Sequence, residues 1–196
     1  MSILNNRNIA VFLDRDGTIN EEANFVRKPE EFVLIPKAAD AIAKLNRLGI
    51  KTFVLTNQSG IARGYYTEEI LSLIHDRMKE LLSDLGAFVD DIFFCPHHPE
   101  GSVPEYSIEC QCRKPKPGLL LVAEKKYHID LERSFVIGDM ERDIETGKAL
   151  NMKTILVLTG KGTETRERLT AGKTPDFIAE DLLDAVNYIE KTLNKK

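Results

Sequence analysis

Two aspartates, Asp14 and Asp16, stand directly after the apolar run of residues 9–13. A short run of apolar and β-branched residues is typical of a buried strand, so Asp14 would lie at the end of a rigid element. The glycine that follows, Gly17, permits a sharp turn. A carboxylate in such a place can attack phosphorus, because aspartyl-phosphate intermediates are an established form of covalent catalysis. The second carboxylate can protonate the leaving oxygen and later deprotonate water.

Further polar groups follow other apolar runs. Thr56 comes after one such run, and Asp139 comes at the end of another. Acids gathered at one edge of a sheet repel one another unless a cation lies among them. A few oxygen ligands suit Mg²⁺, which also accepts phosphate as a ligand. We therefore expect Asp14 and Asp139 to bind magnesium. Thr56 and Lys114 would hold the transferring phosphoryl oxygens by hydrogen bond and charge.

These groups converge only if the apolar runs are strands of one sheet. The runs are short and apolar on both faces, which is typical of a parallel sheet covered on both sides. The expected strands are residues 9–13, 51–55, 91–94, 134–138, 154–158 and 176–180. Helical spacing predicts helices at residues 36–49, 67–86, after Pro117, 142–151 and 182–193. The alternation indicates an α/β fold, a doubly wound Rossmann-like parallel sheet with helices on both faces, in which ligands bind beyond the carboxyl ends of the strands.

The first two helices carry specific expectations. Pro36 fits the first turn of the first helix, and Gly49 fits its end. Thr67 is the expected N-cap of the second helix. The apolar face of that helix, which should pack on the sheet, consists of Ile70, Leu73, Ile74, Met78, Leu81, Leu82 and Leu85. Two histidines in predicted helices, His75 and His128, are expected to be surface or packing residues.

The irregular segments are informative as well. Residues 17–35 and 95–117 are long for loops of a compact domain, and such loops are usually functional or disordered. Residues 159–169 are rich in glycine but lack the spacing of a nucleotide-binding loop, so we expect a mobile surface loop there. Too little chain lies between the motifs for a large cap domain. We therefore expect a single domain over residues 1–196 with an open site.

All three cysteines of the chain lie in or beside the second long segment. Together with one histidine they form the pattern C-x-H-x12-C-x-C, with the residues Cys95, His97, Cys110 and Cys112. Three thiolates and one imidazole make a closed tetrahedral zinc site, which would be structural. The loop of residues 95–112 is polar and proline-rich, which argues against three inert buried cysteines. Zinc would staple this loop and so position Lys114. His98 is the alternative ligand to His97.

Four motifs together resemble those of the haloacid dehalogenase superfamily. They are "DRDGT", "LTNQSG", "KPKPG" and "GDMERD", in the order of that family. The resemblance implies a nucleophile (Asp14), an acid and base (Asp16), two phosphoryl-stabilising residues (Thr56 and Lys114) and a magnesium site (Asp14, Asp16 and Asp139). Asp16 need not use its side chain for the metal.

Asp143 has two interpretations. It matches the second acid of the fourth motif, whose contact with the metal in this family is often through water. It can equally be an acid that the dipole favours at the start of a helix.

The cysteine loop in front of "RKPKPG" resembles one branch of the superfamily, which contains histidinol-phosphate phosphatases and heptose 1,7-bisphosphate 7-phosphatases. The twelve-residue spacer is similar to that of the heptose enzymes. This implies removal of the 7-phosphate of D-glycero-D-manno-heptose 1,7-bisphosphate, a precursor of nucleotide-activated heptose and the lipopolysaccharide core. The substrate contacts it implies are Glu22, Ala23, Asn24, Phe25, Asn57, Gln58, Ser59 and Arg113. Met140 stands where the heptose enzymes often carry lysine.

Two alternatives remain open at this point. The first is the same chemistry on histidinol phosphate. The second is a catalytically inactive scaffold that uses its zinc loop to bind a partner, although the intact motif residues argue against it.

Composition limits the remaining possibilities. A formal net charge of −4 over 196 residues argues against a nucleic-acid-binding protein, which usually carries a basic face. No apolar run approaches the roughly 20 residues of a membrane-spanning helix, and residues 1–8 do not resemble a secretory signal. An odd number of cysteines speaks against a disulfide framework. We expect a cytoplasmic, monomeric enzyme that acts on a small phosphorylated sugar and not on nucleic acid or at a membrane.

Overall fold

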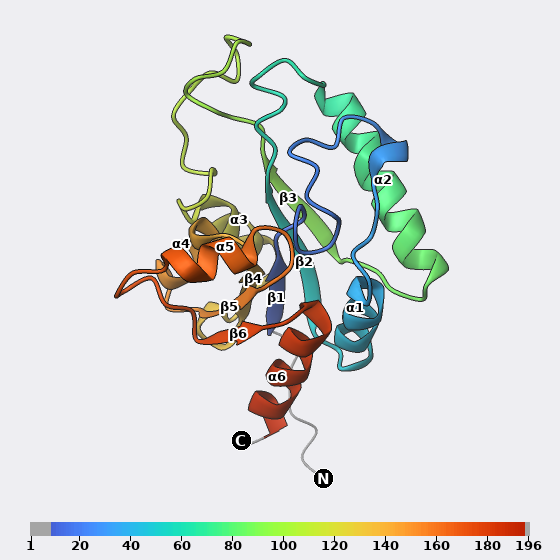
Figure 1. The fold of residues 1–196 in the computed structure, drawn as a ribbon, viewed down its shortest axis with the longest axis vertical. Helices are drawn as coiled ribbons and strands as arrows, with labels where there is room; N and C mark the ends of the chain where they lie inside the picture. Colours follow the sequence, from blue (N-terminus) through green and yellow to red (C-terminus); the bar gives the residue numbers. More distant parts are fainter. Residues whose placement is uncertain (1–8, 195–196) are drawn as a thin grey trace.

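The computed structural model describes residues 9–194, and its centre is a parallel sheet of six strands in the order β3-β2-β1-β4-β5-β6 (Figure 1). The strands are β1 (Ala10–Leu13), β2 (Lys51–Asn57), β3 (Asp91–Cys95), β4 (Phe135–Gly138), β5 (Lys153–Val157) and β6 (Phe177–Ala179). This strand order is that of a doubly wound sheet, so the predicted fold class is confirmed. The expectation about a secretory signal falls on residues 1–8, which lie outside the described part.

Helices cover both faces of the sheet. They are α1 (Ala38–Arg47), α2 (Glu68–Asp84), α3 (Gly118–Tyr127), α4 (Glu141–Lys148), α5 (Gly162–Arg168) and α6 (Leu182–Asn194), with short 3₁₀ turns at Pro29–Glu31 and Leu131–Arg133. One apolar core joins α1, α2 and α6 to one face, and a second core joins α3 to the other. In α4, Gly147 packs closely against Val136 and Thr154. In Figure 1, α1 and α2 lie on one side of the sheet, opposite α3 and α4.

The register of the central strands decides where the site lies. Leu13 at the end of β1 is paired with Val54 of β2 and with Ile137 of β4. The residues that follow these positions therefore emerge side by side at the carboxyl edge of the sheet. The amide of Asp14 continues the pairing by donating to the carbonyl of Ile137 at 2.9 Å. The second strand runs further than predicted and includes Thr56.

Two expectations about helices are wrong in detail. The first helix begins at Ala38, after Lys37 in a left-handed conformation (φ 67°), so Pro36 lies outside its first turn. Leu73 of α2 is 53% exposed, and Leu85, the residue that caps the end of α2, is 61% exposed. The buried stripe is instead Leu71, Ile74, His75, Met78 and Leu82. The sheet covers a narrower stripe of the helix surface than the apolar face that was predicted. Leucines at the edge of the predicted face therefore point into solvent.

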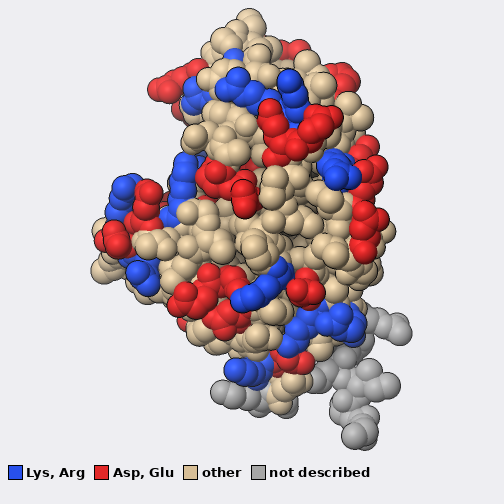
Figure 2. Space-filling model, turned by 45° about the vertical axis from the view of Figure 1, so that its right-hand side comes forward, with Lys and Arg blue, Asp and Glu red and all other residues tan. Residues whose placement is uncertain are grey.

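The described residues form this one sheet and its covering helices, with no large cap. That the whole chain of residues 1–196 is a single domain stays a prediction. None of the helices within residues 9–194 is long and apolar enough to cross a bilayer. Basic and acidic side chains are interspersed on the face shown in Figure 2.

Candidate active site

Four charged side chains meet beyond the carboxyl ends of β1 and β4. Carboxylate oxygens of Asp14, Asp139 and Asp143 lie within 4.8 Å of one another. The ammonium of Lys114 donates to Asp14 Oδ1 at 2.8 Å and to the carbonyl of Leu55 at 2.7 Å, and it pairs with Asp143 Oδ1 at 2.6 Å. The ammonium thus donates two hydrogen bonds to protein oxygens, and its contact with Asp143 is an ion pair. The four charged residues are buried, so an excess of one charge among them is costly unless a further ion balances it.

This cluster suits a divalent cation. Three carboxylates against one ammonium leave two negative charges in excess. Asp139 Oδ1 is buried and has no hydrogen-bond partner among the described residues. Burial, followed by the charges of Asp14 and Asp143, raises the pKa of Asp139 to about 8. Burial also raises the pKa of Asp14 to about 6, although Lys114 opposes this. Mg²⁺ would neutralise the excess charge and occupy the unpartnered oxygen, so the donor set fits this ion.

Residues 159–161 complete the wall beside Asp139. The amide of Lys161 donates to Asp139 Oδ2 at 2.8 Å, and the Thr159 hydroxyl donates to the carbonyl of Gly17 at 2.7 Å. Gly17 (φ 85°) and Gly160 lie so close to the Asp139 carboxylate that a Cβ at either position would overlap it. The expectation of a mobile surface loop at residues 159–169 is therefore wrong. Its first residues contact the site, and the helix α5 forms most of the rest.

The carboxylate of Asp16 is not part of the three-carboxylate cluster. Arg15 donates to both of its oxygens, at 2.8 and 2.9 Å from Nη2, and Asn20 and Gln58 add a hydrogen bond each. Burial by itself raises the pKa of Asp16, but the Arg15 guanidinium and these hydrogen bonds outweigh it and hold the pKa below its usual value. A contribution of Asp16 to the magnesium site would thus have to come from its main-chain carbonyl, and it stays a prediction.

A hydrogen-bond chain fixes the orientation of Thr56. The Tyr66 hydroxyl donates to Gln58 Oε1 at 2.7 Å, which orients the Gln58 amide. Gln58 Nε2 then donates to Thr56 Oγ1 at 2.8 Å and to Asp16 Oδ2 at 2.9 Å. Because Thr56 Oγ1 accepts in this chain, its own proton remains available to a phosphoryl oxygen. Gly60 leaves the space that the Tyr66 ring occupies.

Asn57 holds the backbone of Lys114. Its side chain donates to the carbonyl of Lys114 at 3.1 Å and accepts from the amide of Lys114 at 3.0 Å. Asn57 is also paired with Cys95, because β2 and β3 are neighbours. The end of the second strand is therefore tied both to Lys114 and to the start of the cysteine loop.

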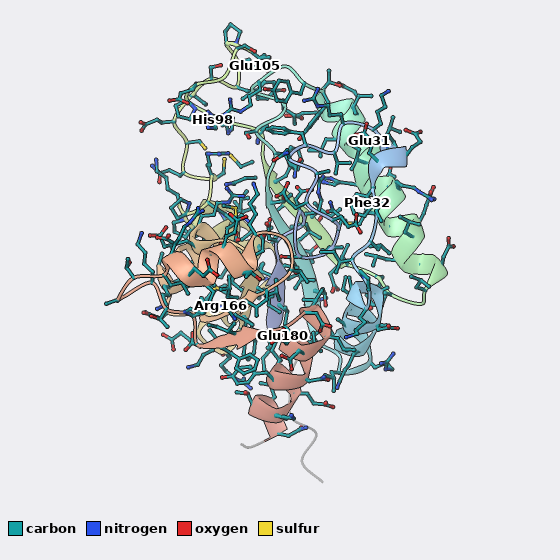
Figure 3. All side chains as sticks on the ribbon, viewed as in Figure 1. Glu31, Phe32, His98, Glu105, Arg166 and Glu180 are labelled. Carbon is teal, nitrogen blue, oxygen red and sulfur yellow. The ribbon has the colours of Figure 1, made fainter. Side chains whose placement is uncertain are left out.

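The cysteine loop brings its four expected ligands together. The sulfur of Cys95 lies 3.1 Å from that of Cys112 and 3.5 Å from that of Cys110, and His97 Nδ1 lies 3.3 Å from the Cys112 sulfur. Tetrahedral zinc with bonds of about 2.3 Å needs donor atoms nearly this close, so the group is compatible with a structural zinc site. His98 instead faces Arg63, at 3.1 Å. In Figure 3, yellow sulfur atoms lie beneath the labelled His98.

A cavity of about 210 Å³ opens beside Asp16. Most of the predicted substrate contacts line it, namely Glu22, Asn24, Phe25, Asn57, Gln58, Ser59 and Arg113. Ala23 is exposed and is not among the lining residues. The cavity is also lined by Arg15, Tyr66, Met140, Arg142 and Lys161. Of these, only Met140 was singled out from the sequence.

Known proteins similar to this chain agree with the geometry. A model of the HAD-hydrolase-like family matches residues 111–185. D-glycero-beta-D-manno-heptose-1,7-bisphosphate 7-phosphatase of Yersinia pestis is 42% identical over 92% of this chain and 95% of its own length. The chain belongs to the heptose-1,7-bisphosphate 7-phosphatase family of haloacid dehalogenase-like hydrolases. A further family member, the alpha-anomer enzyme of Photorhabdus laumondii, is 44% identical over 78% of this chain and 84% of its own length.

Solved structures of the family have the same fold. The D,D-heptose 1,7-bisphosphate phosphatase of B. bronchiseptica, crystallised with magnesium and phosphate, has a TM-score of 0.82 and 34% identity, with 96% of this chain and 99% of that chain covered. The enzyme from Burkholderia thailandensis has a TM-score of 0.69 and 30% identity, over 93% of this chain and 98% of that chain. That a member of the family holds both magnesium and phosphate agrees with the cation-deficient carboxylate cluster found here.

Proposed function

We propose that this protein is a magnesium-dependent phosphatase that removes the 7-phosphate of D-glycero-D-manno-heptose 1,7-bisphosphate. The observation that carries the proposal is the buried group of Asp14, Asp139, Asp143 and Lys114. Residues next to them in the chain, among them Arg15, Arg113 and Arg142, line a cavity. Membership of the heptose enzyme family supports this substrate over histidinol phosphate. The intact acid cluster supports catalysis over an inactive scaffold.

In the first half of the proposed reaction, a carboxylate oxygen of Asp14 attacks the phosphorus of the 7-phosphate. The bond from phosphorus to the sugar oxygen breaks, and that oxygen takes a proton from Asp16. Asp14 Oδ1 accepts from Lys114, whereas no described residue donates to Oδ2. Lys114 and the Thr56 hydroxyl would stabilise the charge of the transferring phosphoryl group.

In the second half, water attacks the phosphorus of the aspartyl-phosphate at Asp14 and gives up a proton to Asp16. Inorganic phosphate leaves, Asp14 is again a free carboxylate, and Asp16 is again protonated, as it was when the first half began. Asp16 takes up this proton from solvent when substrate binds and returns it to solvent when the products have left. Arg15 keeps Asp16 ionised before substrate binds, which suits this base role. The negative charge of a bound phosphate raises the pKa of a nearby carboxyl group, which favours the protonated form that the first half needs.

Two metal ions belong to this proposal. Asp14 and Asp139 would hold Mg²⁺, with Asp143 nearby, and the ion when bound neutralises charge on the carboxylates and the phosphate. Cys95, His97, Cys110 and Cys112 would hold a structural zinc. We further propose that the enzyme is a cytoplasmic monomer, which acts before nucleotide activation of the heptose and binds neither nucleic acid nor membrane.

The decisive experiment incubates the purified protein and Mg²⁺ with the heptose bisphosphate and measures phosphate release. Phosphorus NMR should show that the phosphate at carbon 1 is retained. Asp14→Asn should nearly abolish turnover, whereas the exposed Asp84→Asn should not change it. Parallel assays of both anomers and of histidinol phosphate compare substrates directly. A higher kcat/KM for histidinol phosphate would overturn the substrate, and a fully active Asp14→Asn would overturn the mechanism.

A further inference from the structure

One guanidinium on the cavity wall has no partner in the described part of the protein. Arg142 is the second residue of α4 and lines the cavity together with Met140. Its Nε is buried without a hydrogen-bond partner among the described residues. Within residues 9–194, no carboxylate lies within 4.0 Å of its nitrogens to form an ion pair. A largely buried guanidinium in this state is costly unless an anion meets it.

Arg113 lines the same cavity from the cysteine loop. Its Nη1 donates to the carbonyl of His97 at 3.2 Å, which anchors the side chain on that loop. Burial lowers the pKa of Arg113, and the positive charge of Arg142 contributes to this lowering. Two guanidiniums thus face one cavity from different elements of the fold. Their mutual repulsion is relieved when an anion lies between them.

Arg142 lies near the acids as well as near Arg113, with which it shares the cavity. Burial acts to lower the pKa of Arg142, but Asp143, Asp14 and Asp139 together raise it above its usual value. The main influences on Arg113 are its burial and the charges of the cysteine loop and of neighbouring arginines. A ligand that reaches from Asp14 into the cavity would therefore meet both guanidiniums.

We propose that Arg142 and Arg113 together hold the phosphate that is not cleaved, and that Arg142 thereby sets the preference for bisphosphates over monophosphates. This inference rests on the proposed function. A guanidinium presents a planar fork that matches phosphate oxygens in pairs, and two forks satisfy a dianion better than one. Binding energy at the distant phosphate would then orient the reacting end.

The test compares kcat/KM for heptose 1,7-bisphosphate with kcat/KM for heptose 7-phosphate, which has the same reacting end. Arg142→Met should reduce the preference for the bisphosphate by about 10- to 150-fold, the usual range for losing hydrogen bonds to a charged group. Arg142→Lys keeps the charge without the fork, so the preference should fall by less. Arg168→Met is the matched control, because Arg168 is 77% exposed on α5, and it should leave the preference unchanged.

Product inhibition gives an independent measurement. Heptose 1-phosphate retains the phosphate that Arg142 would hold, so it should inhibit the Arg142→Met variant more weakly than the unaltered protein. Inhibition by inorganic phosphate should change less, because that ion can bind at Asp14. An equal loss for both substrates would overturn the proposal and assign Arg142 to the transferring phosphate. An unaltered preference would overturn it as well.

The two proposals can fail separately. If the unaltered protein does not release phosphate from the bisphosphate, the proposed function is wrong, whatever Arg142 does. If the unaltered protein releases phosphate from the bisphosphate, and both Arg142→Lys and Arg142→Met still prefer the bisphosphate to the monophosphate as strongly, only the proposed role of Arg142 is wrong. Thermal melting of each variant shows that the comparison is made on folded protein.

Discussion

The hydrogen-bond chain from Tyr66 through Gln58 permits a sharp prediction about a residue that does not touch the reacting atoms. Tyr66→Phe removes only the hydroxyl that donates to Gln58 Oε1 at 2.7 Å. Both groups are buried, with Tyr66 7% and Gln58 2% exposed, so water cannot readily replace the donor. The amide of Gln58 then loses the hydrogen bond that decides which of its ends faces Thr56 and Asp16.

The size of the effect follows from the hydrogen bonds that Tyr66→Phe breaks. A buried acceptor without a donor costs about 1–3 kcal/mol. For a chain of this size that lowers Tm by about 2–12 °C. If the amide turns over, Thr56 and Asp16 each lose one hydrogen bond, at 2.8 and 2.9 Å. At about 1 kcal/mol net for each bond, kcat should fall by about 5- to 30-fold.

The dependence of kcat on pH distinguishes a loss of orientation at Gln58 from a general loss of stability. The hydrogen bond from Gln58 helps to hold the pKa of Asp16 below its usual value. Without it that pKa rises, so the acidic limb of kcat against pH should move to higher pH in Tyr66→Phe. The neighbouring Tyr65→Phe is the matched control, since Tyr65 is 44% exposed and lies outside this chain of hydrogen bonds.

A double-mutant cycle tests whether Tyr66 acts on the site through Gln58. If Tyr66 acts through Gln58, then Tyr66→Phe should add little to Gln58→Met, because the second substitution has already removed the amide. Fully additive losses in kcat, or a Tyr66→Phe protein with an unshifted pH profile, would refute the reasoning.

Three further predictions concern other parts of the molecule. Asp16→Asn should lower kcat by about 10²–10⁴-fold with little change in the affinity for inorganic phosphate, the product. If Asp16→Asn instead loses the binding of inorganic phosphate, Asp16 is a metal ligand or a structural residue. Metal analysis should find about one tightly held zinc per chain, and Cys112→Ser should lower zinc content and activity together. A fully active protein without zinc would contradict the role of zinc in holding the cysteine loop. Burial, with the charge of Arg15, lowers the pKa of His75 to about 3, and its value in the unfolded chain is about 6.5. The free energy of unfolding should therefore fall as pH drops from about 6.5 towards 3, by about 1.4 kcal/mol per unit and about 2 kcal/mol at pH 5, and urea titrations of His75→Leu should show a flatter dependence.

Much of the site was accessible from the sequence because one geometric rule covers it. Parallel strands end at the same edge of a sheet, so Asp14, Thr56 and Asp139 had to emerge as neighbours once the strands were recognised. The cysteine pattern was equally informative, because three thiols and an imidazole at this spacing match the donor set of a structural zinc site. The position of Lys114 depends on both features. It lies two residues after the last cysteine, and its ammonium reaches Asp14 at the edge of the sheet.

Residues 159–161 were missed although the same rule applies to them. They follow the fifth strand, so they too emerge at the carboxyl edge. Their glycine and charge content suggested mobility, but Gly160 is needed for close approach to Gly17 and Asp139. The position after a strand was the better signal than the composition.

Tyr66 and Arg142 could not be found in this way. Whether the Tyr66 hydroxyl reaches Gln58 depends on how the turn from Gly60 onward folds back on itself. Whether Arg142 faces the cavity depends on the rotation of α4 about its axis, and a change of one residue in its start would turn the side chain away. The same uncertainty of rotation explains the misplaced leucines of α2.

The helix-start interpretation of Asp143 is observed, and its contact with the metal stays a prediction. The two do not exclude each other, because a carboxylate has two oxygens. Asp143 Oδ2 accepts from the amide of Met140 at 3.1 Å, as expected of an acid in the first turn of α4. Oδ1 pairs with Lys114 at 2.6 Å. The helix contact fixes the direction of the carboxyl group, and Gly138 leaves room for it, since a Cβ there would overlap Asp143. The start of the helix thereby orients the charge that holds Lys114 against Asp14, so a residue that caps a helix also arranges the proposed nucleophile.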